Sequence, residues 1–212
     1  MRQRSMFTRL VLSAAAPLLA FSACAAWSPP PAPGEAPLQQ PGTSVRASGE
    51  QNPLTGLVSL AVQRIDTADE VAAAKFGTSQ PIDDPAREHQ ELDEVTAAAL
   101  KLGVDPGETA RFFQDQIEAN KVVQRGLYGL WSEHPERRPS TKPDLTTTVR
   151  PQLDQLTTQI MDQLRATVEV RHSGATCVDQ ARQAVAGADR NLDELHRHAL
   201  DVAMGSVCTR TG

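Results

Sequence analysis

Apolar residues recur at alternating intervals of three and four positions along most of the chain after residue 50, which is the spacing of one helix face. Two pairs, Asp84-Pro85 and Asp105-Pro106, each supply an N-cap followed by a proline that suits the first helical turn. Gly103 follows the second apolar stripe and favours a helix end there. The pattern predicts six helices, over about 54–76, 84–102, 105–131, 147–173, 176–186 and 190–206.

The fold class follows from what accompanies these stripes. No stretch alternates in the manner of a strand, no internal repeat is visible, and a charged, proline-containing loop fills 134–143. Aromatic residues make up only 4% of the chain, so the core must consist of Leu, Val, Ile and Ala, which favours packed helices over a β-sandwich. The sequence predicts an all-α helical bundle that forms one domain over 51–212.

Two basic residues interrupt the apolar stripe of the first helix. Arg64 and Lys75 are eleven positions apart, close to three full turns, so they point the same way. Either residue alone is explained equally well by a side chain that snorkels to solvent. Both together favour a cationic pocket, because Asp66, Asp69 and Glu70 already occupy the rest of the helix surface.

The first turn of the second helix gathers three charged residues. Asp84 is the expected N-cap, and Arg87 and Glu88 follow on the same side of the turn. A cation in a first turn opposes the helix dipole. Arg87 is therefore expected to have an anionic partner, which is either a ligand or Asp84 itself.

Amides replace apolar residues in the middle of the third stripe, at Asn120 and Gln124. A buried amide without a partner costs about 1–3 kcal/mol. The two side chains would be satisfied by each other, by a facing helix whose register they set, or by a ligand. Arg150, where the loop meets the fourth helix, is by itself explained by surface solvation.

Residues 1–25 have the organisation of a signal peptide. Three arginines precede an apolar run over 10–20, and small residues follow. The run is too short to span a bilayer stably. The segment after it, over 26–50, is rich in Pro, Gly, Ser and Gln and is expected to be a disordered linker. We therefore expect an exported protein, either periplasmic or secreted.

Cleavage of this segment has two possible outcomes. Ala23-Cys24-Ala25 fits the A-x-A pattern of a released protein. Phe21-Ser22-Ala23-Cys24 resembles a lipobox, which would leave Cys24 lipid-modified as a membrane tether, although Phe replaces the usual Leu at its first position. The proline-rich linker suits either outcome.

Loss of the signal peptide removes three arginines and no acidic residue, so the formal net charge changes from -5 to -8. An acidic body argues against nucleic acid and against electrostatic membrane binding. An anionic ligand would therefore need a local cationic pocket. The sequence shows no nucleophile, metal-ligand cluster or phosphate loop, so neither a metal nor a cofactor is expected.

Cys177 and Cys208 remain as a pair in an oxidising compartment, and a disulfide is the default expectation. It would close a loop of about 30 residues and contribute roughly 3–4 kcal/mol on the chain-entropy model. The alternatives are a metal site or a catalytic thiol, for which the sequence offers no second ligand pattern nearby.

In chain order, these polar residues resemble the pattern of the all-helical chorismate mutases. The stretch over 54–131 carries that resemblance, while the signal peptide and the C-terminal cysteine pair resemble the larger, exported, gamma-type members of the family. Each motif is weak singly, but the ordered set is specific. The matching residues are Arg64, ten residues, Lys75, eight residues, Asp84-x-x-Arg87-Glu88, then Asn120-x-x-x-Gln124, with Arg150 later.

The resemblance implies a cofactor-free isomerase that converts chorismate to prephenate, in a homodimer. One C–O bond of an allyl vinyl ether breaks while a C–C bond forms, and no proton need move. The protein must hold the dianion in its compact conformer and stabilise charge developing on the ether oxygen. Cations and neutral donors do both, which suits a residue set without a catalytic dyad.

Roles for the cations follow from the same resemblance. Arg64, Arg87 and Arg150 would bind carboxylates of the substrate. Lys75 would donate to a carboxylate and to the ether oxygen.

The remaining residues would bind the ether oxygen, the ring hydroxyl and a carboxylate of the substrate. Gln124 would be the second donor to the ether oxygen, and its amide is a donor at every pH. Asp84 and Glu88 would hold the ring hydroxyl. Asn120 stands where relatives carry Thr or Ser, so its role as a carboxylate donor is less defined.

Two other functions fit the same scaffold. One is a non-catalytic helical lipoprotein or adaptor, against which the full set of cations and amide donors argues. The other is a binding protein for a different small dicarboxylate. Competition by a bicyclic transition-state mimic would separate that function from the enzyme.

Overall fold

The structure is a computed structural model that describes residues 51–209, and helices are the only regular secondary structure in that range. Four long helices come first: α1 (Thr55–Lys75), α2 (Pro85–Leu102), α3 (Pro106–Glu133) and α4 (Arg150–Ala166). Three shorter helices follow: α5 (Val168–Arg171), α6 (Ala175–Ala188) and α7 (Glu194–Ala203). The predicted all-α class is confirmed. The predicted signal peptide, the linker and Cys24 lie outside the described residues.

The sequence signals at the ends of α2 and α3 act as predicted. The Asp84 carboxylate accepts a hydrogen bond from the Arg87 N–H at 3.1 Å, and Asp105 accepts one from the Glu108 N–H at 2.7 Å. Each satisfies a backbone donor that the first helical turn leaves open. Gly103 ends α2 in the left-handed conformation, with φ of 70°. These caps fix where the second and third helices begin.

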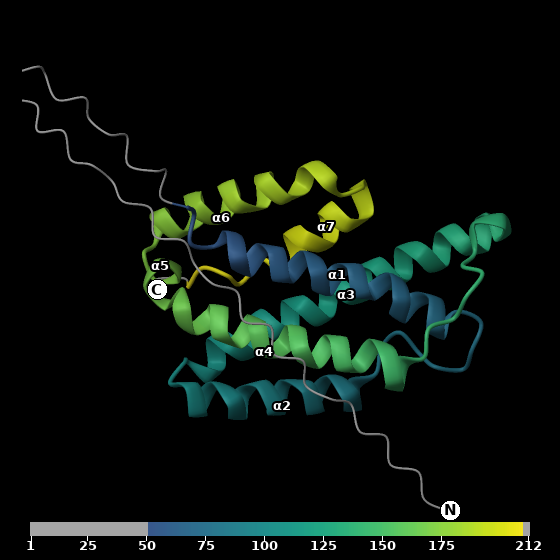
Figure 1. The fold of residues 1–212 in the computed structure, drawn as a ribbon, viewed down its shortest axis with the longest axis horizontal. Helices are drawn as coiled ribbons and strands as arrows, with labels where there is room; N and C mark the ends of the chain where they lie inside the picture. Colours follow the sequence, from purple (N-terminus) through teal and green to yellow (C-terminus); the bar gives the residue numbers. More distant parts are fainter. Residues whose placement is uncertain (1–50, 210–212) are drawn as a thin grey trace, which may run out of the picture. The chain divides into compact units, whose positions relative to one another are not determined.

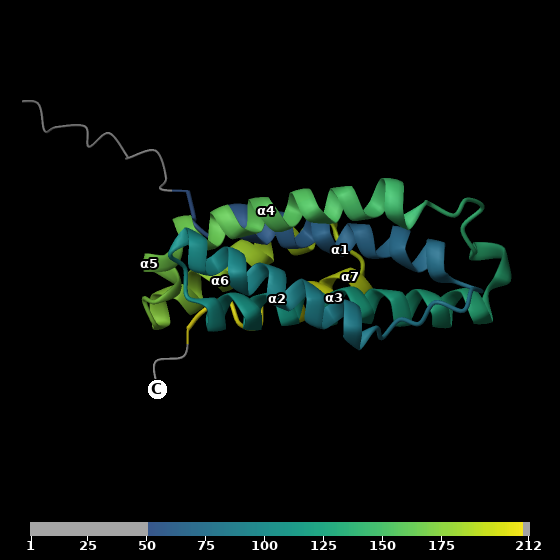
Figure 2. The same ribbon diagram turned by 90° about the horizontal axis from the view of Figure 1, so that it is seen from below.

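Helix α1 is the centre of the bundle, because it packs against α3, α4, α6 and α7. In Figure 1, α6 and α7 lie on one side of α1, whereas α4 and α2 lie on the other. Figure 2 shows α4 beside α1 and α2 beside α3, in agreement with their contacts. Each of the four helices α1 to α4 thus packs against two of the others.

The core is apolar and built largely from aliphatic side chains, as the scarcity of aromatics predicted. Leu54, Leu57 and Ile65 of the α1 segment are almost fully buried, as is Leu200 on α7. Phe112 and Phe113 on α3 are the largest apolar side chains that are fully buried. Burial of a Leu or Phe side chain contributes about 1.5–3 kcal/mol each. The buried faces of α1 and α3 therefore fix the positions of these two helices, whose other faces are free to line a site.

The region predicted as one fourth helix is divided in three. A π-helical turn, η2 (Leu145–Val149), precedes α4, and α4 ends at Ala166 before the single turn α5. Asp144 starts the π-helical turn by accepting from the N–H groups of Thr146 and Thr147, both at 2.8 Å. At the far end, the Thr167 hydroxyl donates to the Gln163 carbonyl at 2.7 Å. The helix break expected at Gly174 is present, because Gly174 has a φ of 63° and precedes α6, and a second break occurs earlier, at Thr167, whose φ of -107° and ψ of 11° leave helical geometry.

The C-terminal helices are close to prediction. Helices were expected at about 176–186 and 190–206, and α6 and α7 are separated by a 3-10 turn, η3 (Asp189–Asn191). The Cys177–Cys208 disulfide is present, with an S–S distance of 2.04 Å, and joins the first turn of α6 to the segment after α7. It closes a loop of 31 residues.

No helix among the described residues is long and apolar enough to cross a membrane. Within 51–209 there is also no cluster of His, Cys, Asp and Glu side chains that could hold a metal ion.

Candidate active site

A cavity of about 460 Å³ lies among α1, α2, α3, η2 and α4. Every residue that the sequence singled out for substrate binding lines it. These residues come from four helices that are distant in sequence: Arg64, Lys75, Asp84, Arg87, Glu88, Asn120, Gln124 and Arg150. One chain therefore assembles the whole predicted set.

Arg64 is the most deeply placed cation of the cavity, with 5% of its surface exposed. One guanidinium nitrogen donates to the Thr157 hydroxyl on α4 at 3.2 Å, and another is paired with the Glu91 carboxylate on α2. Its Nε is buried and has no hydrogen-bond partner within 51–209. Arg64 is therefore held in place by two helices, and its buried Nε–H is left without a partner in that range.

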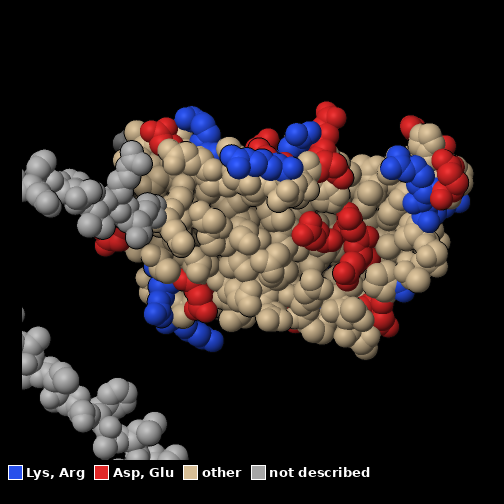
Figure 3. Space-filling model, turned by 45° about the horizontal axis from the view of Figure 1, so that its top comes forward, with Lys and Arg blue, Asp and Glu red and all other residues tan. Residues whose placement is uncertain are grey.

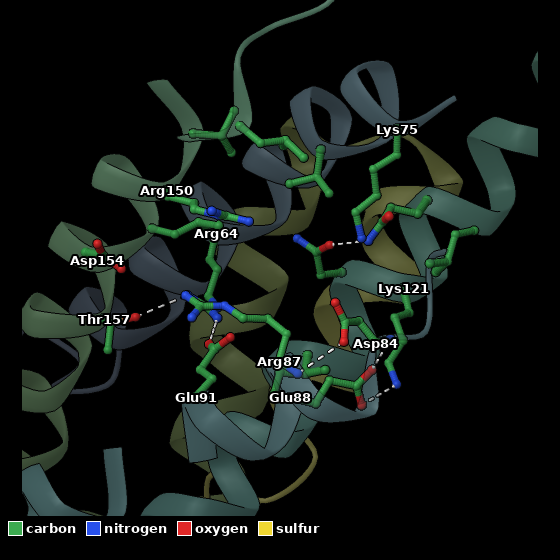
Figure 4. A pocket seen from close by; sticks show the side chains of 18 of the residues that line it. Arg64, Lys75, Asp84, Arg87, Glu88, Glu91, Lys121, Arg150, Asp154 and Thr157 are labelled. Carbon is green, nitrogen blue, oxygen red and sulfur yellow. Dashed lines mark hydrogen bonds and ion pairs between the residues drawn. The ribbon is translucent and has the colours of Figure 1, made fainter. Parts of the chain in front are cut away.

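Arg87 and Arg150 differ from Arg64 in having no fixed partner. Neither guanidinium makes a hydrogen bond or ion pair with another described residue. Figure 4 shows Arg64, Arg87 and Arg150 toward one side of the cavity, and Lys75 and Lys121 toward the other. The cavity thus presents cations at two separated positions, as a compact dianion requires.

Lys75 is half-buried at the end of α1, and its ammonium donates to the Pro81 carbonyl at 2.9 Å. Burial lowers the pKa of Lys75, although the nearby carboxylates of Asp84 and Glu88 act in the opposite direction. A lysine ammonium has three donors, so two remain for a ligand. Lys75 is a cation that can donate into the cavity without first losing a side-chain ion pair.

The first turn of α2 forms a reciprocal cap. The Asp84 backbone N–H donates to Glu88 Oε1 at 3.1 Å, while the Asp84 carboxylate caps the Arg87 N–H. The Asp84–Arg87 ion pair considered as an alternative is absent among the side chains of this turn. Arg87 consequently keeps its guanidinium available.

The two amides of α3 are bonded to each other. Gln124 Nε2 donates to Asn120 Oδ1 at 2.6 Å, which is one of the partners considered from the sequence. Gln124 is 3% exposed, and its Oε1 has no partner within the described part of the chain. An amide nitrogen carries two N–H groups, so a second donor is also left. The pair is therefore only partly satisfied and can still bind a ligand.

Some lining residues were not recognised from the sequence. Glu91 and Thr157 hold Arg64, and Lys121 is buried with its ammonium 2.9 Å from Glu88 Oε2. Glu91 follows Arg87 by four positions, so the shared helix face was a signal that could have found it. No sequence signal marks Lys121, because its place next to Asn120 is typical of a charged residue on the exposed side of a helix.

The lining is balanced in formal charge. Its cations are Arg64, Lys75, Arg87, Lys121 and Arg150, and its acidic residues are Asp84, Glu88, Glu91, Glu94 and Asp154. The lining therefore has no net formal charge. Within 51–209, the cations of the lining without a side-chain ion pair are Lys75, Arg87 and Arg150.

Residues 55–125 match the sequence model of the family described as chorismate mutase type II. A secreted chorismate mutase of Mycolicibacterium smegmatis is 38% identical over 170 residues, which cover 79% of this chain and 92% of the relative. The chain belongs to the chorismate mutase family. A secreted chorismate mutase of Mycobacterium tuberculosis is 32% identical over 175 residues, covering 82% of this chain and 85% of that protein.

Solved chorismate mutases share the fold. The crystal structure of the Burkholderia phymatum enzyme matches with a TM-score of 0.71 at 33% identity, covering 76% of this chain and 98% of that chain. The Burkholderia thailandensis enzyme matches with a TM-score of 0.67 at 35% identity, covering 74% and 99%. The resemblance inferred from the ordered polar residues is confirmed at the level of the family and of its fold.

Proposed function

We propose that this chorismate mutase converts chorismate to prephenate in the cavity among α1, α2, α3 and α4. The observation that carries the proposal is the meeting of all eight predicted residues around one cavity of about 460 Å³. That volume suits a small, compact ligand. The reaction is an intramolecular rearrangement, so residues that bind, orient and stabilise charge are sufficient for it.

The carboxylates of chorismate would bind the arginines. Arg87 and Arg150 have no side-chain partners to lose within the described residues, whereas Arg64 is already paired with Glu91. Charge-assisted hydrogen bonds from guanidinium groups fix both position and orientation. Binding of both carboxylates would hold the side chain and the ring of chorismate in the compact conformer. This orientation lowers the entropic cost of reaching the transition state.

The ether oxygen would lie between Lys75 and Gln124. Negative charge develops on this oxygen as its C–O bond breaks, and donors placed beforehand stabilise that charge. Lys75 comes from the end of α1 and Gln124 from the middle of α3, two helices that pack directly on each other. The two donors are therefore placed by helices that pack on each other.

The ring hydroxyl would bind at the first turn of α2. Glu88 Oε1 already accepts the Asp84 backbone N–H, and the carboxylate retains acceptor capacity for a hydroxyl. Asn120, hydrogen-bonded to Gln124, would direct its own N–H groups toward a carboxylate. Substrate, rather than a catalytic acid or base, occupies the centre of this site.

We further propose that the protein is exported through residues 1–25, as the secreted relatives suggest. Mass spectrometry of the processed protein separates the two cleavage outcomes. A chain beginning at Ala26 indicates release, whereas a lipid-modified Cys24 indicates a membrane tether. An uncleaved N-terminus in an exporting host would contradict both.

A homodimer is also proposed. Figure 3 shows a broad face with few charged side chains, with acidic groups gathered over one part of it. Interface cores are depleted in charged residues, which makes this face suitable for contact between two copies. Sedimentation should give the mass of two chains, and the mass of one chain at micromolar concentration would overturn the proposal.

Turnover and inhibition together test the enzymatic proposal. The purified protein should consume chorismate, and a bicyclic mimic of the transition state should inhibit it far below the KM for chorismate. Tight binding of the mimic without turnover would indicate a dicarboxylate-binding protein. Neither binding nor turnover, in a folded sample, would favour the non-catalytic adaptor.

A further inference from the structure

We propose that Lys121 is a positioning residue that fixes the Glu88 side chain as an acceptor for the ring hydroxyl of chorismate. Lys121 thereby contributes to the selection of substrates that carry this hydroxyl. The inference rests on the proposed function of the cavity, and it assigns a role to a buried lysine that the sequence did not reveal.

The first observation is that Lys121 is buried and fully engaged. Only 7% of the residue is exposed. Its ammonium lies 2.9 Å from Glu88 Oε2, 2.8 Å from Glu118 Oε1 and 3.5 Å from Asp83 Oδ1. An ammonium has three N–H donors, and three carboxylates surround this one. Lys121 therefore has no donor left for substrate and would act through Glu88.

The second observation concerns the orientation of Glu88. Lys121 binds Oε2, while the Asp84 backbone N–H binds Oε1 at 3.1 Å. Both oxygens are thus fixed, and the carboxylate cannot rotate without breaking one of these contacts. Each carboxylate oxygen accepts about two hydrogen bonds, so acceptor capacity is left for a ligand hydroxyl. Of the four groups in the Lys121 cluster, only Lys121 and Glu88 line the cavity.

The third observation is the charge around Glu88. Asp83, Asp84 and Glu118 are its acidic neighbours, Lys75 faces it from α1, and Lys121 is the cation in direct contact. Burial alone would lower the pKa of Lys121, but its hydrogen bonds with Glu118 and Glu88 outweigh that and raise it. Lys121 therefore stays charged over the working pH range. Without it, Glu88 would lose the contact that fixes Oε2 and the cation that offsets its acidic neighbours.

A purely structural explanation would make Lys121 a clamp between α2 and α3. Arg125 offers a matched comparison, because it also lies on α3 and binds Asp83, at 2.6 Å, but does not line the cavity. Lys121→Met should lower kcat/KM for chorismate by about 10- to 100-fold, the range expected for one lost hydrogen bond to a bound polar group. Arg125→Met should change kcat/KM by less than about twofold. Equal losses in the two variants would favour the clamp and overturn the proposal.

The deciding experiment is a double-mutant cycle with Glu88→Gln, a neutral acceptor that needs no cation. Steady-state kinetics of chorismate loss are measured for the exported wild-type protein, Lys121→Met, Glu88→Gln and the double variant. If Lys121 acts through Glu88, the double variant should lose little beyond Glu88→Gln alone. Multiplied losses from the two substitutions would show independent actions and overturn the proposal.

Rescue by a conservative substitution supplies a readout that a general loss of packing does not move. Lys121→Arg keeps a cation beside Glu88 Oε2 and should restore most of the wild-type kcat/KM, whereas Lys121→Met should not. Equal losses of kcat/KM in Lys121→Arg and Lys121→Met would contradict the proposed role. Absence of wild-type turnover would instead refute the proposed function itself.

Discussion

Replacement of Lys75 by alanine should lower kcat for chorismate by about 100- to 1000-fold. Lys75 is half-buried, and its ammonium is held at the end of α1 by the Pro81 carbonyl, 2.9 Å away. It is thus a donor already in place when charge develops on the ether oxygen. Loss of one such donor typically costs about 2.7–4 kcal/mol in the barrier, and each 1.36 kcal/mol corresponds to a factor of ten.

The size of the fall in kcat depends on the surroundings of the Lys75 ammonium. Burial lowers the pKa of Lys75 because water is partly excluded around it, and the same exclusion strengthens its attraction for a developing negative charge. If Lys75 bound only a carboxylate in the ground state, alanine would raise KM and leave kcat nearly unchanged. A large fall in kcat therefore reports on the ether oxygen specifically.

The assay follows the ultraviolet absorbance of chorismate, with circular dichroism and thermal melting as checks of folding. Lys142→Ala is the matched control, because Lys142 also donates to a backbone carbonyl at the end of α1, that of Phe76 at 2.6 Å, but does not line the cavity. That variant should retain kcat within about twofold. A folded Lys75→Ala enzyme with near-normal kcat would refute the reasoning.

Three further predictions concern pH and charge. Activity should persist from mildly acidic through neutral pH, because the Gln124 amide donates a hydrogen bond at every pH. Activity should fall in alkaline solution, because the lowered pKa of Lys75 makes this lysine lose its proton earlier than an ordinary lysine. A steep loss between pH 5 and 7 in a folded sample would contradict the role of Gln124. Glu91→Gln should lower the KM for chorismate by roughly fivefold, about 1 kcal/mol, because the Glu91 carboxylate competes with the substrate carboxylate for the Arg64 guanidinium. Steady-state kinetics that show an unchanged or higher KM would refute this prediction. The His196 ring lies between the carboxylates of Asp69 and Asp193. Burial lowers the pKa of His196, but the contacts with these carboxylates have the larger effect, so the pKa is raised in the folded protein. Its contribution to stability should therefore be complete below its unfolded pKa of about 6.5 and lost as pH rises through the raised value. Thermal melts should therefore show a larger deficit for His196→Gln at pH 5.5 than at pH 9, and an equal deficit at both would count against that linkage.

Much of the fold was predictable because its signals are local. The Asp84 cap depends on a few consecutive residues, and the periodic apolar stripes depend on one helix at a time. The disulfide between Cys177 and Cys208 was predictable by elimination, since only two cysteines remain after the export segment. The end of α4 at Thr167 was not, because no Gly or Pro marks that part of the sequence.

The cavity was predictable only where its residues interrupt an apolar pattern on a single helix. Arg64 and Lys75 stood out because they interrupt an apolar stripe, which places them against the protein interior. Glu91 and Lys121 did not, because their importance arises from partners on other helices. Charged residues on an amphipathic helix look alike until packing decides which of them face one another.

The most direct test of the central claim is turnover of chorismate by the purified protein beside its Arg87→Ala variant. Loss of chorismate is followed in the ultraviolet, and prephenate is confirmed by its acid conversion to phenylpyruvate. The Arg87 guanidinium lines the cavity without a partner among residues 51–209, so its loss should lower kcat/KM by at least about 100-fold, the cost of an unpaired charge in a bound complex. Lys101→Ala, on the exposed end of α2, should have no such effect. Wild-type turnover that Arg87→Ala leaves intact would contradict the site, and no turnover from a folded, disulfide-bonded sample would contradict the enzyme.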